Sequence, residues 1–306
     1  MASYQKVICI AAIFLFILIS GCVDCETDED CTGHRRCVED TCENIYRPKG
    51  VDVSFQVDSP PAKIKADDPF DIILELTNKG SASVEEGKLE VEFYGGRYSL
   101  SDTTWLLDKP LRGAEDYETV GALEFKDFMG VTYTGLAPAG PASILTIGAT
   151  LKYEYETSAK GSICITSPTD DAPFCTESGD KLEAVSSAPV TVSKIEEQIF
   201  SDSVDVAITV VNVGGGDIYR LGGDSVADDD IGIATLTQFE LGSGADNDYL
   251  DWCESTEEYV SATAGATFYC KEIPRTTAST VEEIANITVA YNYKTDISAK
   301  VEVFAH

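Results

Sequence analysis

Two stretches of the chain decide the fold: FDIILELTNKG at residues 70–80 and VDVAITVVNVG at residues 204–214. Each opens with an apolar residue and Asp, continues as an alternation of apolar and mostly polar residues, and ends in Asn-x-Gly. Alternation with a period of two is typical of a β-strand with one buried face, and Asn and Gly accept the backbone angles of a tight turn. Both stretches therefore predict a strand that ends in a turn.

Similar short runs fill the chain from residue 50 onward. They are rich in Val, Ile, Thr and Tyr and are separated by Gly, Asn, Asp and Pro, and no long stretch shows the 3.6-residue period of a helix. Many short strands at this spacing predict an all-β fold of the sandwich or barrel type. The predicted strands are residues 51–57, 70–76, 88–93, 145–155, 204–211, 267–270, 284–293 and 300–304.

The chain also contains an internal repeat. Three pairs of similar segments follow one another in the same order, at offsets of 139, 134 and 140 residues. A nearly constant offset indicates a duplicated domain. We predict two β-sandwich domains, residues 50–188 and residues 189–306. The three pairs are VDVS at 51–54 with VTVS at 190–193, residues 70–80 with 204–214, and YEYETSAK at 153–160 with YKTDISAK at 293–300.

The N-terminus has the features of an export signal. Lys6 precedes an apolar run from Val7 to Ile19, which is shorter than the roughly 20 residues of a membrane-spanning helix. The run ends in Ile-Ser-Gly-Cys, which resembles the lipobox of exported prokaryotic lipoproteins. The resemblance implies a signal peptide at residues 1–21, a lipid on Cys22, and a mature chain tethered to the outer face of a membrane. An uncleaved anchor and a plain signal peptide are the alternatives.

Residues 22–49 form a short acidic module rich in cysteine, which we interpret as a stalk. A segment this short cannot bury a core, so we expect cross-links to hold it. It resembles the small Cys-rich knots of extracellular proteins. We predict the pairs Cys25–Cys37 and Cys31–Cys42, although the sequence leaves three pairings open. A zinc site that includes His34 and a redox motif at Cys22-x-x-Cys25 are less consistent with an oxidising compartment.

Two further pairs of cysteines lie in the β region. Cys164 and Cys175 enclose a loop with two prolines, and Cys253 and Cys270 connect an acidic loop to a predicted strand. Because each pair is close in sequence, we predict two local disulfides. Free buried thiols are the alternative.

The two Asn-x-Gly segments, Asn78–Gly80 and Asn212–Gly214, add a family resemblance. A strand followed by Asn-x-Gly in an exported β domain resembles the CARDB-type, immunoglobulin-like domains of bacterial and archaeal surface proteins. The resemblance covers residues 50–306 loosely, and residues 97–140 and 222–262 do not follow it. It implies that each domain is a two-sheet antiparallel sandwich used for adhesion, spacing or assembly.

The charge balance excludes some functions. The chain has 53 acidic and 22 basic residues, a net charge of −31. Nucleic-acid binding requires basic surface to neutralise phosphate, so we expect no nucleic-acid partner. The same charge opposes docking on anionic lipid headgroups, so we expect membrane contact only through the lipid anchor.

Catalytic chemistry has little support in the sequence. The two histidines are His34, in the Cys-rich module, and His306, at the end of the sequence. Neither position favours a Ser-His-Asp arrangement or a His-rich catalytic zinc site, and none of the common nucleotide-binding or hydrolase motifs occurs. We predict that the protein is not an enzyme. A hydrolase that uses paired carboxylates is the alternative, because acidic residues are abundant.

Candidate sites of two kinds, for ion binding and for modification, can be named. Carboxylate oxygens on loops suit Ca²⁺, although the EF-hand register is absent. Asn286-Ile287-Thr288 is an N-glycosylation sequon. We name Ca²⁺ as a possible cofactor, at the acidic cluster Asp246, Asp248, Asp251 and Glu254 and less favourably at Asp224, Asp228, Asp229 and Asp230.

These observations predict a non-catalytic, lipid-anchored cell-surface protein that mediates adhesion or partner binding through its immunoglobulin-like domains. The expected partners are other surface proteins or glycans, or copies of the chain itself. The structural alternative is a component of the cell envelope, or of a surface filament, that assembles with itself.

Overall fold

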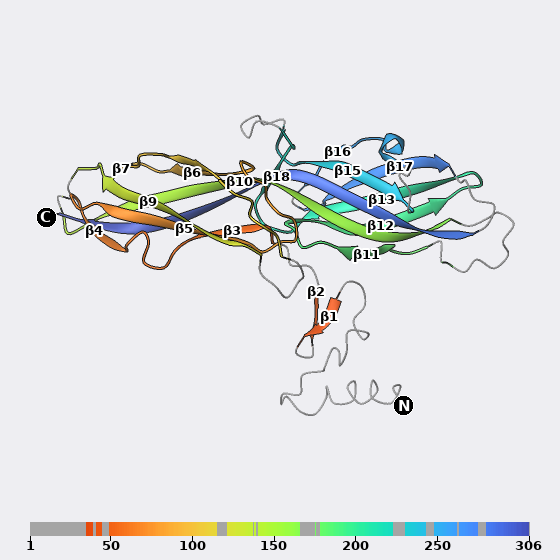
Figure 1. The fold of residues 1–306 in the computed structure, drawn as a ribbon, viewed down its shortest axis with the longest axis horizontal. Coiled ribbons are helices and arrows are strands. Elements are labelled where there is room, and N and C mark those ends of the chain that lie inside the picture. Colours follow the sequence, from red (N-terminus) through yellow and green to blue (C-terminus); the bar gives the residue numbers. More distant parts are fainter. Residues whose placement is uncertain are drawn as a thin grey trace, which may run out of the picture. The chain divides into compact units, whose positions relative to one another are not determined.

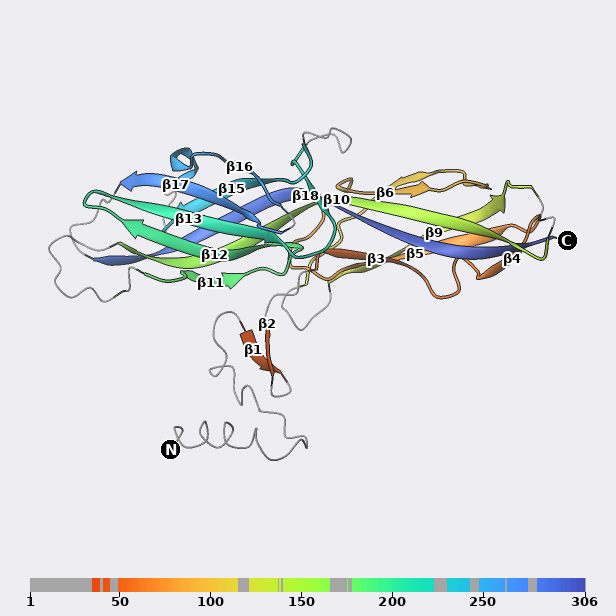
Figure 2. The same ribbon diagram turned by 180° about the vertical axis from the view of Figure 1, so that it is seen from behind.

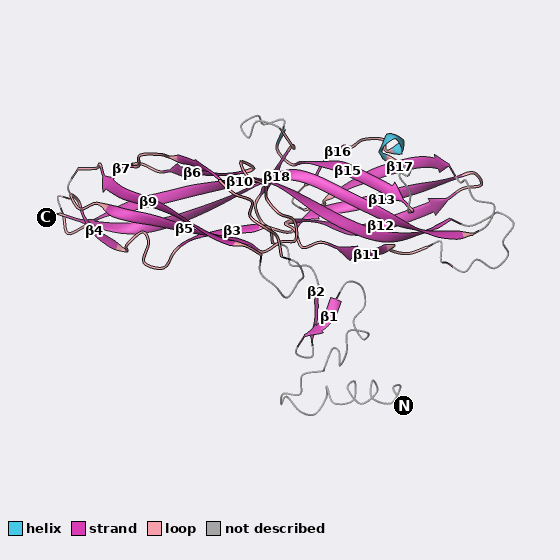
Figure 3. Cartoon of the chain, viewed as in Figure 1, coloured by secondary structure: helices cyan, strands magenta, loops and turns pink. Residues whose placement is uncertain are grey.

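The computed structural model describes residues 49–114, 121–136, 138, 140–165, 175, 178–222, 230–242, 248–261, 263–274 and 280–305, together with the backbone of residues 35–38 and 41–44. Strands account for almost all of the regular structure in these ranges, apart from the 3-10 helix η3 (Leu250–Trp252) (Figure 3). The predicted all-β class is confirmed, and its sheets are mainly antiparallel, as in a β-sandwich.

The chain divides into two compact units, residues 1–45 and residues 46–306. In the first unit, β1 (Arg35–Val38) and β2 (Thr41–Asn44) form an antiparallel pair that places Cys37 opposite Cys42 along the backbone. The side chains of this pair, and Cys25 and Cys31, lie outside the described residues. The disulfide pairing of this module therefore stays a prediction.

The second unit holds the remaining strands. There are sixteen of them, most of which carry a label in Figure 1. They are β3 (Val51–Phe55), β4 (Lys63–Lys65), β5 (Phe70–Asn78), β6 (Leu89–Tyr94), β7 (Tyr98–Ser99), β8 (Thr104–Leu106), β9 (Leu123–Tyr133), β10 (Ser143–Ile165), β11 (Leu182–Val185), β12 (Val190–Ile199), β13 (Ser203–Asn212), β14 (Asp217–Tyr219), β15 (Ile233–Leu241), β16 (Glu257–Tyr259), β17 (Ala266–Pro274) and β18 (Val281–Phe304).

The two stretches that decided the fold are the inner strands of two small sheets. β5 lies between β3 and β9 in a four-stranded sheet that β7 completes, and β13 lies between β12 and β17 in a three-stranded sheet. Their alternation turns one face inward, as predicted. The buried side chains on that face are Phe70, Ile72, Leu74 and Leu76 in β5 and Val204, Val206, Ile208 and Val210 in β13.

Both small sheets face a single nine-stranded sheet built around β10 and β18. These two strands pair antiparallel along the whole of β10, which has 23 residues, from Ser143 opposite Val303 to Ile165 opposite Val281. At about 3.3 Å per residue, such a ribbon is roughly 75 Å long. It runs from one sandwich into the other, as both views show (Figures 1 and 2).

The ribbon changes two details of the predicted organisation. The predicted strands at 284–293 and 300–304 are one continuous strand, because the polar residues between them also pair with β10. The predicted division after residue 188 does not separate the sandwiches. In the first sandwich, the C-terminal part of β18 pairs with β4, and the N-terminal part of β10 pairs with β6. In the second sandwich, the C-terminal part of β10 pairs with β11.

Candidate interaction site

Four tyrosines gather where the two sandwiches meet on the ribbon. Tyr153 lies opposite Tyr293 in the ladder, and Tyr155 lies opposite Tyr291. Their ring centroids are 5.6 Å apart for Tyr153 and Tyr155 and 6.3 Å apart for Tyr291 and Tyr293, within the range of favourable aromatic contact. The cluster joins the cores of the two sandwiches.

The hydroxyl groups of two of these tyrosines hold the first strand of each repeat. The Val51 N–H donates to the hydroxyl of Tyr153 (3.1 Å), and the Val190 N–H donates to that of Tyr291 (3.2 Å). Tyr153 therefore corresponds to Tyr291, at an offset of 138 residues. The third sequence match, made at an offset of 140, was wrong by two residues. The repeated Tyr-x-Tyr at 153–155 and 291–293 was the signal that could have given the correct register.

The Asn-x-Gly motif has a structural role in the first repeat. The Asn78 amide group, fully buried, donates to the carbonyl oxygens of Ala82 (2.8 Å) and Leu111 (3.1 Å). Its Oδ1 accepts from the Gly80 N–H (3.2 Å) and from the Tyr155 hydroxyl (3.1 Å). Four hydrogen bonds satisfy the amide completely, which explains why this buried position carries Asn.

The second repeat uses its Asn in the same way. Asn212 Nδ2 donates to the Gly216 carbonyl oxygen (2.7 Å), and its Oδ1 accepts from the Gly214 N–H (3.2 Å) and the Tyr293 hydroxyl (3.4 Å). Two turns with one hydrogen-bond pattern support the duplication that the sequence predicted.

Because the tyrosine cluster is buried, the free energy of unfolding should fall as the pH rises above about 10. Desolvation raises the pKa of Tyr153, Tyr155, Tyr291 and Tyr293 above the ordinary value of about 10. Below pH 10 these groups are neutral whether the chain is folded or unfolded. Above it the unfolded chain releases their protons first, so stability is lost as the pH rises, by up to about 1.4 kcal/mol per pH unit for each tyrosine.

Urea unfolding midpoints between about pH 8 and pH 11 measure this loss. The Tyr291→Phe variant removes one titrating group, so its midpoint should fall less steeply above pH 10 than that of the natural chain. If the urea midpoints of both proteins fall equally steeply with pH, the titration of Tyr291 does not contribute to the loss of stability.

A groove of about 370 Å³ lies beside the tyrosines. Its walls come from β3, with Val51 and Val53, and from β18, with Thr295 and Ile297, and Pro189 contributes at one end. The ionisable side chains along its described lining are those of Lys49, Asp52 and two tyrosines. Apolar walls and strand edges suit the binding of an extended polypeptide better than a chemical reaction.

Asn286 lies on the outer face of the nine-stranded sheet. Its neighbours in β18, Ala285 and Ile287, are buried, so the Asn286 side chain points to the opposite face, where it is half-buried. It lines a groove of about 490 Å³ together with Ser158 and Gln238. An outward Asn is compatible with the sequon, and its glycosylation stays a prediction.

The favoured calcium cluster is not assembled by the residues that the structure describes. The Asp248 Oδ1 accepts from the Leu250 N–H (3.1 Å), and Glu254 forms an ion pair with Lys271 (2.7 Å). Among the described residues, no group of three or more His, Cys, Asp or Glu side chains could hold a metal ion. Asp251 is exposed, and Asp246 lies outside the described residues.

The second acidic cluster is described only at Asp230. This side chain forms an ion pair with Arg220 (3.0 Å). Asp224, Asp228 and Asp229 lie outside the described residues, so binding of Ca²⁺ there stays a prediction.

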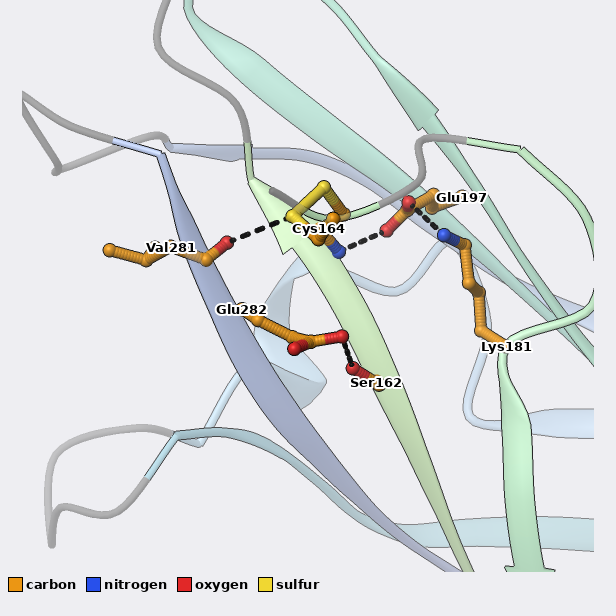
Figure 4. The surroundings of a disulfide bond; sticks show 7 residues. Ser162, Cys164, Lys181, Glu197, Val281 and Glu282 are labelled. Carbon is orange, nitrogen blue, oxygen red and sulfur yellow. Dashed lines mark hydrogen bonds and ion pairs between the residues drawn. A yellow bond between two sulfur atoms is a disulfide. The ribbon is translucent and has the colours of Figure 1, made fainter. Parts of the chain in front are cut away.

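The two local disulfides are present as the sequence predicted, Cys164–Cys175 and Cys253–Cys270. Beside the first, the Cys164 N–H donates to Glu197 Oε2 (2.7 Å), and Lys181 Nζ lies 2.6 Å from Glu197 Oε1 (Figure 4). The side chains of Glu197 and Lys181 are 0% and 8% exposed. The sequence analysis missed this buried ion pair, because nothing local distinguishes Glu197 from the many exposed acids.

Disulfides persist in oxidising compartments, so both bonds indicate an extracellular type of environment. Within the described residues, no helix is long and apolar enough to cross a membrane. Cys22 lies outside those residues. Comparison with protein-family models finds no match, and neither does comparison with curated proteins.

All four predicted disulfides can be tested by mass. Intact mass after alkylation without reduction should show no label on the eight cysteines from Cys25 to Cys270, and alkylation after reduction should add eight labels. Labelling of Cys25, Cys31, Cys37 and Cys42 without a reductant, together with bound zinc, would favour the metal site.

Proposed function

We propose that the protein is a non-catalytic component of the cell surface, exported and anchored by a lipid on Cys22, which binds partner polypeptides through its β-sandwiches. The observation that carries the proposal is the groove between β3 and β18, where two strand edges and apolar side chains border one space. The two disulfides, the acidic surface and the scarcity of histidine support it.

The chemistry of the groove favours recognition of an extended chain. Strand edges supply backbone N–H and C=O groups, which give affinity for any extended peptide, and side-chain pockets select its sequence. A negatively charged exterior favours neutral or basic partners and suppresses acidic ones. The CARDB-type resemblance, which implies adhesion, is consistent with this role.

The anchor and the binding role need separate tests. Cys22→Ser should move the protein from the membrane fraction to the medium. For binding, the chain that begins at residue 22 serves as bait for surface proteins of the producing cell. A specific partner should be retained by the natural chain and lost with Ile297→Arg, which puts a charge in the groove, provided that the variant keeps its melting temperature.

Other outcomes would favour the alternatives. Concentration-dependent polymers of the unanchored chain would favour a self-assembling envelope component. Hydrolysis of a surface polysaccharide, abolished by replacing one pair of carboxylates, would show an enzyme and contradict the proposal.

A further inference from the structure

The duplicated ribbon permits a comparison of equivalent positions in β10 and β18, which differ by 138 residues. In the second sandwich, the inward-facing residues Thr157 and Ala159 of β10 are 0% and 3% exposed, and Gly161 is also buried. Their equivalents in β18 are Thr295, Ile297 and Ala299, all of which are partly exposed.

This exposure is local to one part of β18. Tyr293 and Val301, the inward-facing residues on either side of the partly exposed positions, are 3% and 1% exposed. The inward face of β18 is therefore buried at both ends and only partly buried in the middle. A general loosening of the strand would not produce that pattern, so the described part of the chain covers this place less than it covers the two ends.

Two elements border this part of β10 in the second sandwich: β12 of the facing sheet, whose Ile195 side chain lies against Gly161, and, in the same sheet as β10, β11. It pairs with β10 so that Val185 lies opposite Ala159 and Leu182 lies opposite Gly161. On β18, β14 pairs only as far as Lys294 and β4 begins at Glu302. Among the described residues, the seven from Thr295 to Val301 thus pair with β10 on one side and with no strand on the other. We name this stretch the β18 notch.

The backbone of the notch is oriented to accept a strand. The Glu302 N–H donates to the Ala62 carbonyl oxygen, on the side away from β10, and the Ile284 carbonyl oxygen accepts from Gly242 on that same side. Because the direction of the backbone groups alternates along a strand, Asp296, Ser298 and Lys300 direct their N–H and C=O groups into the notch. At the filled site, the equivalent Ser158 and Ser162 bond to the β11 segment.

We propose that the β18 notch is a β-augmentation site that takes one extended segment of a different polypeptide, with small apolar side chains at alternate positions and no net negative charge. Its seven residues match a segment of about five to seven residues. Small apolar side chains would lie beside Ile297 and Ala299, as Val185 and Leu182 lie opposite the equivalent Ala159 and Gly161.

A second copy of the chain, joined notch to notch, does not fit. β14 and β4 stand about 4.8 Å beyond β18 at the two ends of the notch. Antiparallel pairing of two notches across a two-fold axis would bring β4 of each copy against β14 of the other. Two chains of charge −31 would also repel each other. Both arguments favour a single, neutral or basic segment.

This inference deepens the proposed function and rests on it, because it names the binding edge and the chemistry of the partner. The notch as a binding site and the proposed binding of partners can be tested separately. The experiment below needs only the protein and a defined peptide, so a negative result would remove the notch as a site and leave partner binding through other surfaces to the pull-down.

The probe is the blocked peptide Lys-Leu-Glu-Ala-Val-Ser-Ser-Ala, the sequence of residues 181–188, which contains the strand that fills the equivalent site. Backbone amide exchange of the full chain is followed by NMR, with and without peptide at about 5 mM, a concentration suited to weak binding. Without peptide, the amides of Asp296, Ser298 and Lys300 should exchange at least tenfold faster than those of Ser158 and Ser162. With peptide, the first three should slow by at least tenfold.

Two variants separate strand addition from other effects. Ser298→Pro removes one N–H that faces the notch and leaves the ladder with β10 intact, since that N–H does not point toward β10; binding should be lost. Ser298→Ala keeps the N–H and should bind as the natural chain does. The proposal is overturned if the three notch amides are already as slow as those of Ser158 and Ser162 without peptide, because the chain itself then fills the notch. It is also overturned if peptide slows none of them, or if Ser298→Pro binds normally while its fold is retained.

Discussion

Replacement of Glu197 by Ala is expected to lower the free energy of unfolding by about 3–5 kcal/mol. The substitution leaves the Lys181 ammonium group, 8% exposed, buried without its carboxylate, and it removes the acceptor of the Cys164 N–H. The loss of both partners at once is what makes the effect large. Urea unfolding followed by tryptophan fluorescence measures it.

The adjacent residue in β12 supplies the control. Glu196 forms an ion pair with Lys194, but both side chains are about half-exposed, at 51% and 45%. Glu196→Ala should therefore change stability by less than about 1 kcal/mol. The double variant Lys181→Met with Glu197→Leu, which replaces the pair by apolar side chains, should recover most of the loss. A cost below about 1 kcal/mol for Glu197→Ala would show that the pair is not buried in solution.

The second large effect concerns the ribbon. Leu74→Ala, in the core of the first sandwich, should cost about 2–5 kcal/mol, because Leu74 is fully buried. Since β10 and β18 belong to both sandwiches, the second sandwich should lose stability to the same extent. We expect one cooperative transition for residues 46–306.

The two tryptophans make this measurable. Trp105 lies in β8 of the first sandwich, and Trp252 lies in η3, beside the second. Variants that keep only one of them report on one sandwich each. Leu74→Ala should shift both urea midpoints together, and Glu75→Ala, on the solvent side of the same strand, should shift neither by much. If Leu74→Ala leaves the urea midpoint reported by Trp252 unchanged, the two sandwiches unfold independently.

Local patterns in the sequence predicted the strands well. The alternation in residues 70–76 and 204–211 reports directly on which face is buried, so β5 and β13 were found with their inward residues. The local cysteine pairs were found because each closes a short loop. In these cases the information lies within a few residues of the feature.

The features that sequence analysis missed depend on distant partners. Residues 294–299 have no continuous apolar pattern, and only pairing with β10 makes them part of one strand. The same holds for Glu197, whose burial depends on Lys181 and on the segment at Cys164. The β18 notch is visible only by comparison with the filled edge of β10, which requires the correct register of the repeat.

The exchange of strands between the repeats has a consequence for inheritance. In arrays of separate domains, recombination can delete or copy one repeat and leave its neighbours folded. Here, deletion of the second repeat would also remove Val301 and Val303 from the core of the first sandwich. A gene that gained or lost one repeat would therefore encode a sandwich without one of its core strands. The two repeats can be duplicated or deleted only together.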